Sequence, residues 1–323
     1  MADSLAQLYK DRDFITEIQL IAIMIIFVPV RTLRNILLQG FLLLFFLCPA
    51  RAQVQYVSTA DDIALGKIVL QELAASAGQK NSSELMVQAA RRLLGQKYVA
   101  GTQEGRDEKL RIFLTQTDCI LFAETCLGLV KTAQRCGPDA TFEDLAETLL
   151  HSRYRDGVVD RYESRLHYTT EWVLQGEREG LFRDLTDDLG GIPDTRPINF
   201  MTQHSDSYAP LAGESNYAKE NRARIAPIEE RLSRAPRSYI PKAKIAEVEG
   251  SIRSGDILCF TSGVEGLDIS HVVIAYRAKA GDRLGFIHAS INEKKVIIDP
   301  RTLEAALSAS RNITGIKVLR VEP

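Results

Sequence analysis

Apolar positions follow a helical period in the first half of the chain and fall into shorter runs in the last third. Three segments show the spacing of amphipathic helices: residues 60–94 with one internal break, residues 117–133 and residues 141–150. We expect Ser82 or Ser83 to cap the helix that follows the break. Thr141 followed by Asp144 resembles a capping box and predicts where the third segment begins.

The last third predicts strands. Short runs rich in Ile, Val and Phe, bounded by Gly, Asp or Ser, occur at residues 256–261, 271–276, 284–288 and 296–299. This pattern is typical of a small, mostly antiparallel sheet. Helices followed by strands favour an α+β fold.

The segment between these two parts is polar and only weakly periodic. It runs over about residues 152–245 and contains the single Trp of the chain. A long excursion of this kind, with little core of its own, is typical of a segment that shapes a binding cleft.

The N-terminus is far more apolar than the rest. Residues 18–30 and 36–47 are almost entirely apolar, two arginines lie between them, and an Ala-x-Ala motif ends at Ala52. This order predicts a secretory signal over residues 1–52, cleaved to leave one domain, 53–323. We therefore expect export, most simply to a periplasm. The alternatives are an extended or misannotated start before Met24, or retention of both apolar runs as a membrane anchor.

Overall composition and charge exclude several classes. The chain has 323 residues, 45% apolar and 25% charged, as in ordinary globular proteins. Its 40 basic and 42 acidic residues give a net charge of −2, so we expect no nucleic-acid partner. No C-x-x-C or H-x-x-x-H pair indicates a metal site, and we expect no metal.

The cysteines beyond residue 52 are even in number, which permits disulfides in an oxidising compartment: Cys119, Cys126, Cys136 and Cys259. Cys119 and Cys126 lie two helical turns apart, roughly 10 Å. That separation is too long for a disulfide between them.

Cys119 is the first candidate for chemistry. It lies at the start of the helix predicted over residues 117–133, where the helix dipole and free N–H groups favour a thiolate. The same N–H groups can stabilise an oxyanion. The alternative is that Cys119 is a small buried apolar residue.

Two histidines strengthen the first interpretation. His271 opens one predicted strand and His288 ends the next. If these strands form a hairpin, both imidazoles reach the same edge of the sheet, as a thiol, base and orienting group require. The alternative is that both histidines are structural or lie on the surface.

An ordered set of short stretches resembles the cell-wall hydrolases of the NlpC type, which are papain-like, and specifically their N-acetylmuramoyl-L-alanine amidase-like family. These stretches are Asp118-Cys119, SGDIL at 254–258, GLDISHVVI at 266–274, FIHAS at 286–290, and residues 142–155, 162–172 and 199–205. The resemblance covers about residues 85–318. It departs from the wider superfamily at Ile120, where a small residue is common, and in the length of the excursion.

The resemblance implies a papain-like fold and cleavage of the amide between (anhydro)N-acetylmuramic acid and L-Ala, with no metal or organic cofactor. Cys119 would attack the carbonyl, His271 would shuttle the proton and His288 would orient His271. The backbone N–H of Cys119 would help to hold the oxyanion.

Several residues are candidates for binding the substrate. Arg165, His167, Tyr168 and Trp172 lie within eight positions. Arginine pairs with carboxylates, and aromatic faces suit sugar rings. The alternative for each is an internal ion pair or a core anchor. The set is completed by Ser164 and by Asp118 and Ser270, which precede Cys119 and His271.

The leading hypothesis is an exported muropeptide amidase whose partner is peptidoglycan or its fragments. We expect membrane contact only through the N-terminal segment. The alternatives are a γ-D-glutamyl peptidase of stem peptides and a muropeptide-binding protein without catalysis.

Overall fold

The computed structural model describes residues 54–105 and 107–322. The signal predicted at residues 1–52 lies outside the described residues. Residues 54–323 group into one compact unit. Within the described part, no helix combines the length and apolarity needed to cross a membrane.

The first half is helical, as predicted. Its helices are α3 (Ala60–Ala77), α4 (Ser82–Arg92), α5 (Cys119–Cys136) and α6 (Phe142–Arg153). The capping box of Thr141 and Asp144 at the start of α6 is confirmed. The expected serine cap of α4 is wrong, because Asn81 caps that helix in a reciprocal box with Glu84.

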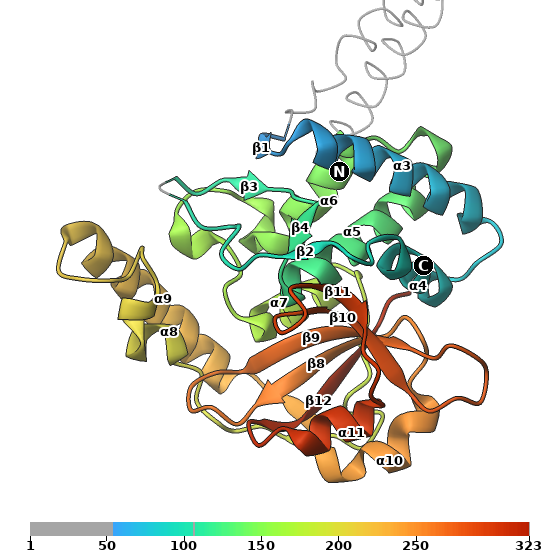
Figure 1. The fold of residues 1–323 in the computed structure, drawn as a ribbon. Helices are drawn as coiled ribbons and strands as arrows, with labels where there is room; N and C mark the ends of the chain where they lie inside the picture. The colour runs from blue at the N-terminus through green and yellow to red at the C-terminus, as the bar shows by residue number, and fades with distance from the viewer. Residues whose placement is uncertain (1–53, 106, 323) are drawn as a thin grey trace, which may run out of the picture. The chain divides into compact units, whose positions relative to one another are not determined.

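Helix α5 is the centre of the helical layer. It packs against α3, α4 and α6 on one side and against two strands of the sheet on the other. Most of its residues are buried. Helix α5 therefore lies where the helical layer meets the sheet (Figure 1).

The main sheet is larger than the small sheet predicted, and it is mixed. Its order is β4-β2-β11-β10-β9-β8-β12-β7-β6, with β5 beside β12. The strands are β2 (Lys97–Tyr98), β4 (Gln116–Thr117), β5 (Arg183–Asp184), β6 (Ile192–Pro193), β7 (Ser238–Pro241), β8 (Ile257–Ser262), β9 (Ile269–Tyr276), β10 (Gly285–Ser290), β11 (Lys295–Ile298) and β12 (Ile313–Arg320). A separate parallel pair joins β1 (Tyr56–Val57) and β3 (Leu110–Arg111).

All four predicted strands are present as β8 to β11, with antiparallel pairing between successive strands. The prediction missed β12, which lies between β8 and β7. Gly315 interrupts the apolar run of β12, and the structure requires it: a Cβ there would overlap the backbone of Ile240 on β7. The remaining strands that it missed are mostly two residues long, too short to show a period.

The sheet separates two apolar clusters. On the helical side, side chains of α5 pack with Ile257, Val272 and Ile287. On the other side lie Leu258, Val273 and their neighbours. Helices α10 (Ile245–Val248) and α11 (Leu303–Ala309) contribute apolar side chains to this second cluster (Figure 1).

The excursion has more structure than predicted. It contains α7 (Thr169–Arg178), α8 (Phe200–Gln203) and α9 (Asn216–Arg234). The expectation of little core is wrong, since a third apolar cluster is formed here by Tyr162, Tyr168, Ile198, Met201, Leu211, Ile225 and Leu232. These residues are far apart in sequence, and α9 carries Pro227 and many charges, so no strong period announced them. Short 3-10 turns complete the chain at Gly137–Asp139, Arg155–Gly157, Tyr162–Ser164, Ser205–Ser207, Lys242–Lys244 and Glu249–Ser251.

Candidate active site

Cys119 is the first residue of α5. Asp118 precedes it in extended conformation and caps the helix, its carboxylate accepting a hydrogen bond from the N–H of Leu121 (3.0 Å). Backbone N–H groups of Val272 and Ile120 lie close enough to the Cys119 sulfur to act to lower its pKa. The nucleophile candidate therefore lies beside β9, next to the residue that follows His271.

Burial outweighs the helix start in setting the charge of this thiol. Part of Cys119 reaches solvent, but surrounding protein and the Asp118 carboxylate raise its pKa to about 12. The helix terminus therefore does not by itself set the charge of Cys119, because the effect of burial is larger. Here the thiol is neutral and has to lose its proton during attack.

The two histidines meet as the hairpin prediction required. Strand β9 pairs antiparallel with β10, and His271 Nε2 lies 2.7 Å from His288 Nδ1. A register shift between β8 and β9 leaves Ser270 out of the pairing just before His271. Bulges of this kind re-aim the side chains next to them.

Both imidazoles are neutral in this environment. Burial, and then the neighbouring His288, lower the pKa of His271 to about 3. Burial also lowers the pKa of His288, against the raising effect of Asp299. A neutral His271 is the form that can accept a proton from the Cys119 thiol.

Sequence analysis missed two residues of this centre. Burial raises the pKa of Tyr98 on β2, and the nearby Cys119 and Asp118 raise it further, to about 12. The phenol of Tyr98 therefore keeps its proton. Asp299, just after β11, lies 3.3 Å from His288 Nε2. Neither belongs to a local motif, although residue 299 ended a predicted strand.

A cavity of about 240 Å³ opens from the first turn of α5. Five of the candidate binding residues line it: Asp118, Arg165, His167, Tyr168 and Trp172. The rest of the lining comes mainly from α5, from other residues of the excursion and from Asp268 and Ile269, just before Ser270 and His271. The structure thus brings most of the predicted binding residues together at one side of Cys119.

The polar atoms of these residues are engaged within the protein. Arg165 pairs with Glu104 (2.8 Å) and Glu108 (3.1 Å). His167 Nε2 lies 2.7 Å from a backbone carbonyl, and burial lowers the pKa of this imidazole well below its usual range. The Tyr168 hydroxyl donates to a buried glutamate (2.7 Å), and the Trp172 indole donates to a serine (3.1 Å). These bonds fix the shape of the cavity wall.

Ser164 and Ser270 are not among the residues that line this cavity. The Ser164 hydroxyl donates to the carbonyl of Arg161 (2.6 Å). The Ser270 hydroxyl donates to the carbonyl of Phe260 (3.3 Å).

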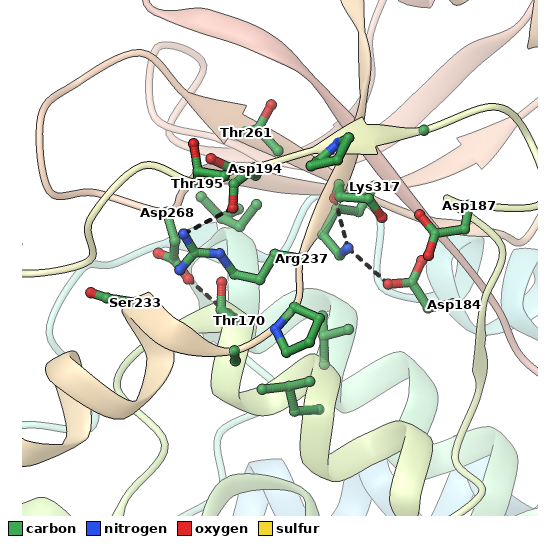
Figure 2. A pocket seen from close by; sticks show the side chains of 18 of the residues that line it. Thr170, Asp184, Asp187, Asp194, Thr195, Ser233, Arg237, Thr261, Asp268 and Lys317 are labelled. Carbon is green, nitrogen blue, oxygen red and sulfur yellow. Dashed lines mark hydrogen bonds and ion pairs between the residues drawn. The ribbon is translucent and has the colours of Figure 1, made fainter.

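A larger cavity of about 690 Å³ lies next to this one and shares Asp268 and Ile269 with it as lining residues. Figure 2 shows Lys317 bonded to Asp184 (2.8 Å) and Arg237 bonded to the backbone carbonyl of Asp194 (3.3 Å). Figure 2 also labels Asp194, whose carboxylate binds Arg196. This cavity is thus bordered by ion pairs.

The cysteines among the described residues are free: Cys119, Cys126, Cys136 and Cys259. Among residues 54–105 and 107–322, no group of three or more His, Cys, Asp or Glu side chains could hold a metal ion.

The model of a family described as AmiA-like, N-acetylmuramoyl-L-alanine amidase-like, matches residues 88–313. The chain belongs to this amidase-like family. Its Cys119, His271 and His288 all fall within the matched range.

Solved structures of similar proteins share the fold of this chain. An N-acetylmuramoyl-L-alanine amidase from Bacteroides uniformis is 33% identical, with a TM-score of 0.69 over 75% of this chain and 99% of that one. A Bacteroides fragilis protein provisionally named a xylanase is also 33% identical, with a TM-score of 0.66 over 72% and 99%. A Legionella pneumophila protein, 20% identical with a TM-score of 0.60 over 82% and 97%, shares the fold. No curated protein matches the chain.

Proposed function

We propose that this amidase-like protein is an exported cysteine hydrolase of muropeptides, cleaving the amide between (anhydro)N-acetylmuramic acid and L-Ala. The observation that carries the proposal is the placement of Cys119 beside β9, with His271 and His288 hydrogen-bonded at 2.7 Å. A nucleophile, a neutral base and an orienting group are the set that acyl transfer needs.

The proposed reaction is stepwise. His271 takes the Cys119 proton as the sulfur attacks the lactyl carbonyl, forming a tetrahedral intermediate. His271 then gives that proton to the L-Ala nitrogen, the C–N bond breaks and the peptide leaves with a free amine. Water, deprotonated by His271, hydrolyses the remaining thioester and releases the sugar acid.

The oxyanion needs donors at the nucleophile. The backbone N–H of Cys119, at the start of α5, is one such donor. The protonated phenol of Tyr98 is proposed as the second, since it is near Cys119 and its pKa is raised to about 12. Asp118, whose carboxylate caps the helix, holds the first turn in place.

The test is digestion of a defined muropeptide by the purified protein, with product masses. Cys119→Ala should abolish cleavage. Cys136→Ala is the matched control, because this free cysteine lies at the opposite end of the same helix and should retain full activity. Undiminished cleavage by Cys119→Ala would refute the mechanism.

The masses also identify the bond. Free sugar acid with an intact peptide supports the amidase, whereas sugar that still carries L-Ala shows a stem-peptide peptidase. No cleavage, with binding retained, shows a binding protein.

Export is a separate part of the proposal, supported by the apolar segment and the Ala-x-Ala motif before residue 53. N-terminal sequencing of protein from fractionated cells should find Gln53 first. A start before residue 36 in a membrane fraction would indicate an anchor instead.

A further inference from the structure

Beyond the two histidines lies a carboxylate, Asp299, which faces His288 Nε2, a buried ring nitrogen without a hydrogen-bond partner among the described residues. His288 lies on β10 opposite Ile297 of β11. The chain leaves β11 at Ile298, and this places Asp299 Oδ2 3.3 Å from His288 Nε2. The side chains of His288 and Asp299 are 9% and 3% exposed, so little water competes for this contact.

Asp299 is held from its other side. Its backbone N–H donates to the carbonyl of Phe286 on β10 (3.0 Å). Its Oδ1 accepts hydrogen bonds from the backbone N–H and Nε of Arg301 (both 2.9 Å), and its Oδ2 accepts one from Nη2 (2.7 Å). Hydrogen bonds and charge from Arg301 lower the pKa of Asp299 below its usual range, so the group remains a carboxylate, which only accepts hydrogen bonds.

We propose that Asp299, held by Arg301, is a positioning residue that sets the tautomer of His288 and, through it, the tautomer of His271. The inference rests on the proposed role of His271 as the base for Cys119.

The position of each proton depends on the group next to it. A carboxylate at His288 Nε2 favours a proton on that nitrogen, which leaves Nδ1 as an acceptor. His271 Nε2, at 2.7 Å from that Nδ1, must then carry its own proton and donate. Only His271 Nδ1 is left unprotonated, and it is the nitrogen free to take the Cys119 proton. With the opposite tautomer of His288, its Nδ1–H would require His271 Nε2 to accept, and Nδ1 of His271 would be blocked.

Replacing Asp299 with Asn should move the proton of His288 from Nε2 to Nδ1. Arg301 directs two donors at the Oδ1 position and one at Oδ2. The amide oxygen of Asn therefore takes the Oδ1 place, and its NH₂ group faces His288 Nε2. That nitrogen must now accept, so the proton of His288 moves to Nδ1.

The chain contains a matched control. Asp194-Thr195-Arg196 repeats the arrangement of Asp299-Pro300-Arg301, with bonds from Arg196 N (3.1 Å), Nε (2.8 Å) and Nη2 (2.6 Å) to the carboxylate of Asp194. Asp194 borders the larger cavity (Figure 2) and contacts neither histidine. Asp194→Asn thus removes a similar Asp–Arg pair without touching the site.

The experiment combines ¹⁵N NMR of the five histidines with kinetics. In the wild-type protein, we expect protons on Nε2 of both His271 and His288; a proton on Nδ1 of His288 would overturn the proposal without any variant. In Asp299→Asn, the His288 proton should move to Nδ1. Loss of the carboxylate behind a metal-bound imidazole costs about 10- to 100-fold, and we expect a similar fall in kcat with KM unchanged. Asp194→Asn should keep the wild-type tautomers and rate.

Alkylation of Cys119 by iodoacetamide separates this inference from the proposed function, because it needs no substrate. It should slow in Asp299→Asn by a similar factor and stay unchanged in Asp194→Asn. Slower alkylation with a moved proton supports the inference even if muropeptides are not cleaved. Unchanged histidine tautomers and an unchanged alkylation rate in Asp299→Asn would overturn the inference even if the protein cleaves muropeptides.

Discussion

Replacing Arg165 with Met tests whether this residue binds substrate or holds the cavity together. Its side chain is 12% exposed and pairs with the side chains of Glu108, which is 7% exposed, and Glu104, which is 40% exposed. It also lies 5.4 Å from the ring centre of Tyr162. Met keeps most of the aliphatic volume and removes the charge.

The expected cost comes mainly from Glu108. Breaking a buried ion pair by removing one partner costs about 3–5 kcal/mol, whereas the exposed pair with Glu104 is worth about 0–1 kcal/mol. Glu108 keeps a hydrogen bond from Tyr154 (2.8 Å), which favours the lower end. We therefore expect Arg165→Met to lower the free energy of unfolding by about 3 kcal/mol at neutral pH.

Urea denaturation of a double-mutant cycle measures this. With Arg165→Met, Glu108→Gln and the double variant, we expect a coupling energy of about 1–3 kcal/mol. Burial already raises the pKa of Glu108, and loss of Arg165 raises it further. The native state then binds a proton at higher pH than the unfolded chain, so the deficit of Arg165→Met should shrink as the pH falls from 7 towards 5.

A change in unfolding free energy below about 1 kcal/mol, together with a large rise in KM for a muropeptide, would refute the structural role. It would show that the Arg165 charge acts on the substrate.

Three further predictions concern other parts of the molecule. Tyr98→Phe should lower kcat for muropeptide cleavage by about 100-fold, if its phenol is an oxyanion donor, and an unchanged kcat would exclude that role. Gly66→Ala should cost about 1–3 kcal/mol of unfolding free energy in urea, because its Cβ would lie 2.7 Å from the ring of Phe142; Gly78→Ala, with nothing within 4 Å, is the control and should be nearly neutral. The pKa of His271 is lowered to about 3, so below pH 6.5 the unfolded chain binds a proton at this residue that the native state does not bind. The free energy of unfolding should therefore fall as the pH is lowered, by up to about 1.4 kcal/mol per pH unit. His271→Gln should flatten that slope between pH 6.5 and 4, and an unchanged slope would contradict the lowered pKa.

The sequence by itself determined the local parts of this protein. The box of Thr141 and Asp144, a helix beginning within two residues of Cys119 and the β9–β10 hairpin depend on neighbouring residues, so period and turn rules found them. That hairpin also sufficed to bring His271 to His288, because antiparallel pairing joins the start of one strand to the end of the next.

Only the tertiary structure decided what surrounds that pair. The contact of Asp299 with His288, the nearness of Tyr98 to Cys119 and the partners of Arg165 each join segments that no spacing rule relates. The charge of the site was decided in the same way. A helix start favours a thiolate, but desolvation depends on every atom packed around the sulfur, and those atoms come from distant parts of the chain.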